Sequence, residues 1–182
     1  MPAMRLLFAL LLLILPARAA DDTLSAAANS AFLAANAARP GTIVRPSGLQ
    51  YRVLKPGFGV RPGGNDVVRI AYSLKLINGT LVDSTPANLP MAVALNSVGL
   101  AGLSEALSLM HVGERWQLVM PAALAFGVKG SPTGNVPGGQ ALVMDLTILS
   151  AAAPRAGETL PENPFSYWSN GREMGGSFTI HP

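Results

Sequence analysis

The clearest pattern along the chain is a period-two alternation over residues 67–76. Its apolar positions are Val68, Ile70, Tyr72, Leu74 and Leu76. Successive side chains of a β-strand point to opposite faces, so this alternation predicts a strand with one buried face. A one-residue slip would turn the whole apolar set toward water, and this fixes the register of the strand.

A turn signal follows this strand at Asn78-Gly79, a dipeptide that favours tight hairpins. The chain then returns as a second strand over residues 80–83. Further runs predict strands at residues 49–54, 91–95, 114–120 and 140–149. Residues 121–139 hold five Gly and three Pro, which predicts a long loop with a structural or functional role.

Two segments show the spacing of a helix. Residues 100–110 place Leu103, Ala106, Leu107 and Met110 on one face. Residues 22–38 are rich in alanine, and their apolar stripe is so narrow that this helix needs a partner surface or frays. Strands dominate the rest, and they do not alternate with helices. The predicted fold class is α+β, with an antiparallel sheet around one short helix and a second short helix before it.

The first 19 residues have the pattern of a secretory signal peptide. Arg5 precedes an apolar run over residues 6–15 that is too short to span a bilayer comfortably. Ala17-Arg18-Ala19 fits the small residues of a cleavage site. We therefore expect cleavage near Ala19 and a periplasmic or secreted protein. The alternative is a retained membrane anchor.

These patterns divide the chain into four parts: a signal peptide at 1–19, a helix and linker at 20–47, a folded domain at 48–150, and a tail at 151–182. The tail has few aliphatic residues and scattered aromatic ones. This composition favours a disordered tail, and an aromatic strap that docks on the domain or on a partner is the alternative.

Charge and composition exclude several classes of function. The formal net charge is +3, and loss of Arg5 and Arg18 with the signal peptide lowers it by two. No basic cluster follows a phosphate backbone, so we expect no nucleic-acid partner. The absence of cysteine excludes thiol catalysis. No His/Asp/Glu spacing resembles a metal site, so we expect no metal and no cofactor. The segment 102–106 approaches a nucleophile elbow but lacks its second Gly, which argues against a serine hydrolase.

Six short motifs, in order along residues 32–149, together resemble the FKBP-type peptidyl-prolyl isomerases, and especially their exported bacterial branch, the macrophage infectivity potentiator type. They are Phe32-Leu33-Ala34-Ala35-Asn36-Ala37, Pro46-Ser47-Gly48-Leu49-Gln50-Tyr51, Asn78-Gly79-Thr80-Leu81-Val82-Asp83-Ser84, Glu105-Ala106-Leu107 with Met110-His111-Val112-Gly113-Glu114, Pro121-Ala122-Ala123-Leu124-Ala125-Phe126-Gly127, and Ala141-Leu142-Val143-Met144-Asp145-Leu146.

The resemblance implies a proline pocket, and its positions can be assigned one by one. The catalytic positions fall on Tyr72, Asp83, Leu100 and Phe126, where the Leu100 backbone N–H would bind the substrate carbonyl. The substrate-binding positions fall on Val82, Met91, Leu103, Val136 and Met144. Most of the family's aromatic rings are thus replaced by aliphatic side chains, and Phe126 lacks the hydroxyl of the family's tyrosine.

Such a pocket would need no nucleophile, metal or proton transfer. Rotation about X–Pro is slow because amide planarity is worth about 18–20 kcal/mol, and a dry apolar site favours the twisted amide, which has less charge separation. Loss of several rings, at about 0.5–1.5 kcal/mol each, predicts efficiency reduced by roughly a factor of ten to a thousand.

The same residues also allow two interpretations other than an isomerase pocket. The first is a periplasmic chaperone or peptide-binding module with little turnover, because methionine-rich surfaces are adaptable binders. The second is ordinary packing, in which Val82, Leu103 and Met144 are core residues, Asp83 caps a turn and Tyr72 is a core tyrosine. The expected partners are unfolded, proline-containing polypeptides. A monomer is expected, since the resembling branch dimerises through N-terminal helices much longer than residues 22–38.

Overall fold

The computed structural model describes residues 22–86, 88–157 and 159–160. The predicted signal peptide and most of the predicted tail lie outside the described residues. Within them, no helix is both long and apolar enough to cross a membrane.

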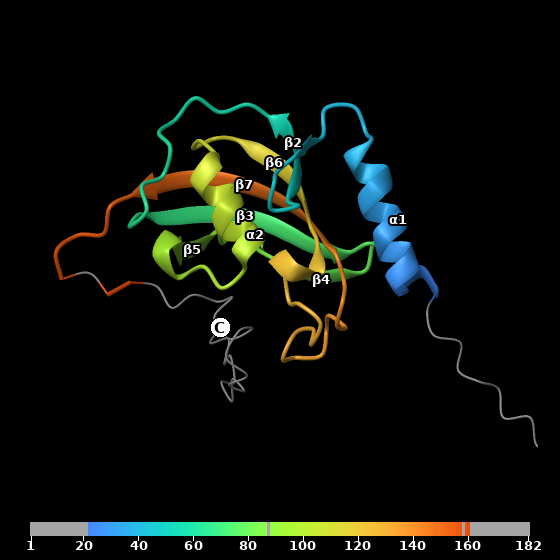
Figure 1. Ribbon diagram of the computed structural model, residues 1–182. Coiled ribbons are helices and arrows are strands. Elements are labelled where there is room, and N and C mark those ends of the chain that lie inside the picture. The colour runs from blue at the N-terminus through green and yellow to red at the C-terminus, as the bar shows by residue number, and fades with distance from the viewer. Residues whose placement is uncertain (1–21, 87, 158, 161–182) are drawn as a thin grey trace, which may run out of the picture.

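One antiparallel sheet of seven strands forms the body of the described part of the chain (Figure 1). The strands are β1 (Ile43–Val44), β2 (Gln50–Lys55), β3 (Val67–Leu76), β4 (Leu81–Ser84), β5 (Met91–Ala94), β6 (Arg115–Met120) and β7 (Leu142–Ala152). Their order across the sheet is β1-β2-β6-β7-β3-β4, and β5 also pairs with β3. This confirms the predicted antiparallel α+β fold.

Helix α2 (Ala101–Leu109) lies against one face of the sheet (Figure 1). Its Leu103, Ala106 and Leu107 are fully buried, as their helical spacing predicts. They join the inward residues of β3 in one hydrophobic cluster, which contains Val68, Ile70, Tyr72, Leu74 and Leu76. The alternation along β3 is therefore the core face of the sheet.

The remaining elements within the described ranges are helix α1 (Ala26–Ala37) and three short 3-10 helices, η1 (Asp22–Leu24), η2 (Leu95–Ser97) and η3 (Ala122–Leu124). Leu95 was expected to end a strand but begins η2, where its N–H donates to the Asp66 carbonyl. Two-residue β1 lies in the expected linker and is too short for a periodic signal. Strand β7 runs to Ala152 and so includes the first two residues of the expected tail.

Helix α1 packs on the domain through polar side chains as well as its apolar stripe. The apolar stripe of segment 22–38 consists of Leu24, Ala28 and Phe32, and all three are half-buried. The two buried residues of the helix itself are Asn29 and Asn36. The Asn36 side chain donates to Gln50 Oε1 at 2.8 Å. Buried amides need hydrogen-bond partners, so each asparagine fixes how the helix meets the sheet.

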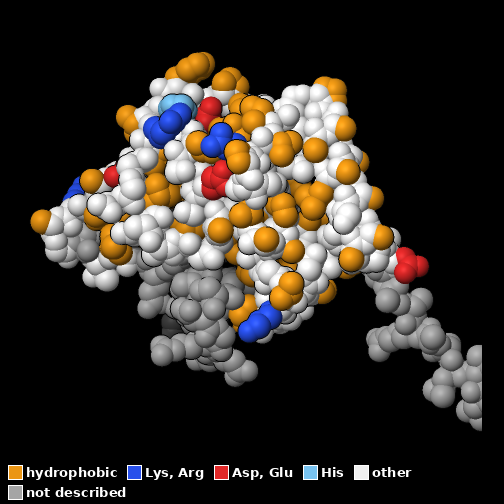
Figure 2. Space-filling view, viewed as in Figure 1, with side chains coloured by type: hydrophobic (Ala, Val, Ile, Leu, Met, Phe, Trp, Pro, Cys, Tyr) orange, Lys and Arg blue, Asp and Glu red, His pale blue; other side chains and the backbone are white. Residues whose placement is uncertain are grey.

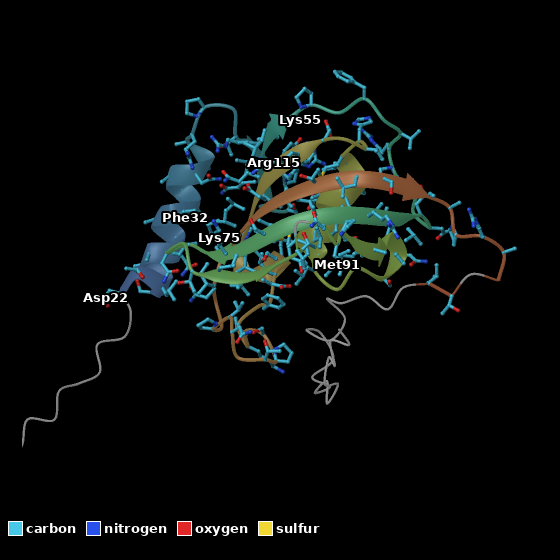
Figure 3. The ribbon with its side chains drawn as sticks, turned by 180° about the vertical axis from the view of Figure 1, so that it is seen from behind. Asp22, Phe32, Lys55, Lys75, Met91 and Arg115 are labelled. Carbon is cyan, nitrogen blue, oxygen red and sulfur yellow. The ribbon has the colours of Figure 1, made fainter. Side chains whose placement is uncertain are left out.

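Phe32 of α1 and Lys75 of β3 line a shallow pocket of about 220 Å³ between the helix and the sheet (Figure 3). This pocket lies under α1, on the face of β3 opposite the hydrophobic cluster, because Lys75 alternates with the buried residues of that strand.

Candidate functional site

Tyr72 and Asp83 are brought together by the β3–β4 hairpin. Leu74 of β3 pairs with Asp83 of β4, and the turn between them has Gly79 at a φ of +88°, which glycine tolerates without strain. The Tyr72 hydroxyl donates a hydrogen bond to Asp83 Oδ2 at 2.5 Å. The Ser84 N–H donates to the other carboxylate oxygen at 2.8 Å. The carboxylate of Asp83 is thus held from two sides.

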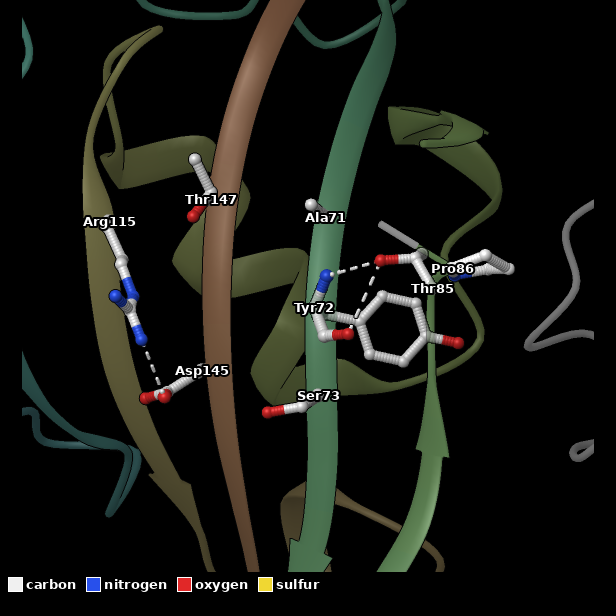
Figure 4. A pocket seen from close by; sticks show the side chains of 8 residues that line it. All are labelled: Ala71, Tyr72, Ser73, Thr85, Pro86, Arg115, Asp145 and Thr147. Atoms are coloured by element: carbon white, nitrogen blue, oxygen red, sulfur yellow. Dashed lines mark hydrogen bonds and ion pairs between the residues drawn. The ribbon is translucent and has the colours of Figure 1, made fainter. Parts of the chain in front are cut away.

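Tyr72 lies at the point where β3 changes from one neighbouring strand to another. Strand β5 pairs with residues 67–70 of β3, and β4 pairs with residues 73–75, so the partner strand changes at Tyr72. Thr85 occupies this junction (Figure 4). Its hydroxyl accepts a hydrogen bond from the Tyr72 N–H at 3.0 Å, and its own N–H donates to the Tyr72 carbonyl at 3.0 Å. Thr85 therefore replaces a strand partner and fixes the backbone that carries the tyrosine.

The Tyr72 hydroxyl is kept protonated by its surroundings. The side chain is 5% exposed. Burial, and then the hydrogen bond to Asp83 and the charge of that carboxylate, raise the pKa of Tyr72 well above its ordinary value of 10.0. Tyr72 is consequently a permanent hydrogen-bond donor at neutral pH and does not serve as a base.

Leu100 and Leu103 lie at the start of α2. Leu100 is the residue before the first turn, is 2% exposed, and accepts a hydrogen bond from the Ser104 N–H. Its own N–H donates no hydrogen bond within the described part of the chain. Because buried N–H groups are nearly always paired, this donor is suited to an external acceptor.

Gly102 allows this end of α2 to approach the sheet closely. A Cβ atom built there would lie 2.8 Å from Met120 Cγ and 3.2 Å from Leu124 Cβ. The first distance is shorter than real Cβ contacts and the second is tighter than most of them. A side chain at residue 102 would therefore require Met120 or the start of α2, which carries Leu103, to shift.

The other predicted pocket residues share one cluster but differ in exposure. Leu103 and Met144 are 0% exposed and Val136 is 1% exposed, which ordinary core packing also produces. Val82, Met91 and Phe126 are half-buried and pack against the same cluster. The residues with surface available to a ligand are therefore Val82, Met91 and Phe126, with Asp83 beside them.

Phe126 and Val136 belong to the loop 121–141, which folds on itself between β6 and β7. The Gly139 N–H donates to the Gly127 carbonyl at 2.9 Å, and Ser131 bonds to both the carbonyl and the N–H of Val136. A Cβ atom at Gly138 would lie 2.0 Å from the Val128 carbonyl oxygen. The glycines that predicted a loop therefore allow residues 138–139 to approach residues 127–128 closely.

Sequence reasoning missed two supporting residues of this site, Thr85 and Ser131. Both act on backbone groups through a hydroxyl, and neither belongs to a periodic pattern. Only their positions carry a signal, since Thr85 follows the Asp83-Ser84 pair at the end of a strand and Ser131 precedes a proline in a Gly-rich loop.

The chemistry of the described surface supports no alternative centre. No group of three or more His, Cys, Asp or Glu residues lies close enough in the described ranges to hold a metal ion. Acidic and basic side chains are scattered over the face seen in Figure 2, without a basic cluster. A shallow pocket of about 240 Å³ does lie on the outer face of β3, lined by hydroxyl groups and the Arg115–Asp145 ion pair (Figure 4). It is on the opposite side of the strand from the hydrophobic cluster.

Comparison with known sequences identifies the family. The model of the family described as FKBP-type peptidyl-prolyl cis-trans isomerase matches residues 59–149. That range includes all nine predicted site residues. The chain belongs to the FKBP-type peptidyl-prolyl cis-trans isomerase family. A second model, described as the domain amino terminal to FKBP-type peptidyl-prolyl isomerase, matches residues 16–53.

Similar proteins of this isomerase family are found in bacteria and a protozoan. An outer membrane protein MIP of Legionella longbeachae is 43% identical over 111 residues, which are 59% of this chain and 47% of that protein. A macrophage infectivity potentiator of Trypanosoma cruzi is 35% identical, over 72% of this chain and 67% of that protein. This FKBP-type chain spans about half the length of several bacterial relatives, namely 46–52% of three of them.

Solved structures share the fold of this FKBP-type chain. A crystal structure of FkpA from Escherichia coli has a TM-score of 0.64 and 30% identity, over 70% of this chain and 61% of that one. A peptidyl-prolyl cis-trans isomerase from Pseudomonas syringae has the same TM-score and 28% identity, over 69% of this chain and 92% of that one.

Proposed function

We propose that this chain is a peptidyl-prolyl cis-trans isomerase that acts on X–Pro bonds of exported, partly folded polypeptides. The observation that carries the proposal is the Tyr72–Asp83 hydrogen bond at the edge of an apolar cluster, together with the Leu100 N–H, which has no partner among the described residues. The family supports this reaction, and the site offers no nucleophile that would support another.

In the proposed mechanism, a substrate proline contacts the half-buried Val82, Met91 and Phe126. The Leu100 N–H donates to the carbonyl of the bound peptide and sets its orientation. Asp83, fixed by Tyr72, forms the polar side of the site beside the rotating amide. The apolar surroundings favour the twisted amide over either planar form, because the twisted form needs less solvation.

The proposed activity is lower than that of relatives with aromatic pockets. Val82, Met91, Leu103 and Met144 stand where the family has larger rings, and Leu103 and Met144 are wholly buried in the cluster. Aliphatic side chains offer less rigid area for proline to stack on, so the efficiency falls by roughly ten- to a thousandfold.

Export and a monomeric state are part of the same proposal. The signal-like segment 1–19 and the relative described as an outer membrane protein support export. The half-buried face of the short helix α1 is already used against its own sheet, which leaves that face unavailable for pairing with a second copy.

The experiment that tests the isomerase is a protease-coupled assay on a proline-containing tetrapeptide. Asp83→Ala removes the carboxylate, and we expect kcat/KM to fall at least about tenfold, since a hydrogen bond to a charged group is worth about 1.5–3 kcal/mol. Asp145→Ala is the matched control, because that carboxylate lies on the opposite face of the sheet. Equal rates in the two variants would contradict the role of Asp83.

A binding module with little turnover is the second candidate, and exposed apolar residues favour it. Leu81, Leu89 and Val128 lie within two residues of predicted site residues in the sequence and are 56%, 69% and 88% exposed. Such side chains hold unfolded segments without catalysis. Suppression of aggregation without turnover in the tetrapeptide assay would support this candidate over the isomerase.

A further inference from the structure

Helix α1 is hydrogen-bonded to the base of the loop that carries two of the proposed site residues. Loop 121–141 holds Phe126 and Val136, and its last two residues are Gln140 and Ala141. The Ala141 N–H donates to Asn29 Oδ1 at 2.7 Å, and Asn29 Nδ2 donates to Gln140 Oε1 at 3.0 Å. One asparagine side chain thus binds both residues at the end of the loop.

The connection is reinforced by the two residues that precede α1. Gln140 Nε2 donates to the Leu24 carbonyl at 3.0 Å, and Asn29 Nδ2 is also within reach of the carbonyls of Leu24 and Ser25, at 3.2 and 3.0 Å. Asn29 is 5% exposed and Gln140 is 6% exposed. Water has little access to these groups, so they would remain unpaired if the contact were broken.

The base of the loop is also joined to the residue that follows Phe126. The Gly139 N–H donates to the Gly127 carbonyl at 2.9 Å, directly after Phe126. Residue 139 is the neighbour of Gln140. A displacement of residues 140–141 would therefore also move the backbone at Gly127. The bonds between Ser131 and Val136 are internal to the loop.

We propose that Asn29 is a positioning residue for substrate binding, which holds loop 121–141, and with it Phe126 and Val136, in place beside the site. The proposal rests on the proposed isomerase function. Asn29 itself touches no substrate. It acts by pairing the Gln140 side chain and the Ala141 N–H, so that the loop has one arrangement rather than several.

Two measurements on the full chain test this role. Asn29→Ala is expected to raise KM for the tetrapeptide about tenfold with little change in kcat, because a loop that must be ordered on binding lowers affinity. Hydrogen exchange of the amides in residues 127–141 is expected to become at least about tenfold faster. If the wild-type chain proves inactive, the proposed isomerase function is wrong. Hydrogen exchange does not depend on activity, so it still decides whether Asn29 holds the loop.

Asn36→Ala is the matched control, since it removes a buried asparagine from the other end of α1, where the partner is Gln50 of β2. It is expected to lower the stability of the helix without faster exchange in the loop. Equal acceleration by both variants, or unchanged exchange in Asn29→Ala, would overturn the proposal.

Gln140→Ala keeps the test decisive if Asn29→Ala fails to fold. It removes the side-chain contacts to Asn29 and Leu24 but leaves the Ala141 N–H bonded to Asn29. We therefore expect exchange in residues 127–141 to be faster than in the wild type, and no acceleration at all would overturn the proposal.

Discussion

At the scale of single residues, the pair formed by Tyr72 and Asp83 connects the core to the proposed site. Tyr72 has its ring in the hydrophobic cluster and its hydroxyl on the carboxylate. Both positions were assigned through the family resemblance, in which the pocket tyrosine falls on Tyr72 and the pocket carboxylate falls on Asp83. Thr85 could not be predicted, since its hydroxyl pairs with a backbone group at a point where the partner strand changes.

The raised pKa of Tyr72 makes a prediction about stability at alkaline pH. The unfolded chain loses the phenolic proton near the ordinary value of 10.0, whereas the folded chain keeps it. The unfolded state then binds fewer protons, so stability falls as pH rises above about 10. Tyr72→Phe lacks this proton, and we expect its stability to fall less steeply than that of the wild type in the same range.

Urea unfolding of both proteins on either side of pH 10 measures this difference. The Tyr72→Phe variant should be less stable at pH 8, by about 1.5–3 kcal/mol for the lost hydrogen bond to a charged group, and this difference in stability should narrow as pH rises. If the free energies of unfolding of the two proteins changed with pH in parallel, the fold would not raise the pKa of Tyr72.

At the scale of elements, periodicity predicted the strands and α2 well because their buried faces are apolar. It described α1 less completely. The apolar stripe of α1 is half-buried as expected, but the buried positions are Asn29 and Asn36, and a pattern of hydrophobic residues does not register amide side chains that find distant partners. The two-residue β1 was missed because it is too short for any period.

The close approach of α2 to the sheet gives an element-scale prediction. Gly102→Ala would improve helix propensity by about 1 kcal/mol, but its Cβ would meet Met120 and Leu124 at 2.8 to 3.2 Å. Overpacking in a filled core costs about 1–3 kcal/mol, so we expect a net loss of stability in urea unfolding.

Ser108→Ala provides the control for this change, because Ser108 is exposed on the same helix. Its effect should stay within about 0.5 kcal/mol. A Gly102→Ala protein as stable as the wild type would mean that Met120 moves aside without cost and that Leu103 is not held by this contact.

At the scale of the whole molecule, the fold class and the family could both be predicted, because six motifs occur in order along one domain. The substrate contacts could not be predicted to the same degree. Full burial of Leu103 and Met144 agrees with a pocket floor and with ordinary packing, and sequence does not separate these roles.

The state of assembly is also a property of the whole molecule. Because α1 packs on its own sheet, sedimentation velocity at micromolar concentration should show a single species with the mass of one chain. A stable dimer would instead require a surface other than the half-buried face of α1.

The central claim is an isomerase site with a reduced rate, and the tetrapeptide assay tests it most directly. We predict that the wild-type chain accelerates cis–trans exchange, with kcat/KM roughly ten- to a thousandfold below that of a relative whose pocket is aromatic. No acceleration over the uncatalysed rate would contradict the activity, and a rate equal to that of the aromatic relative would contradict the argument from ring loss.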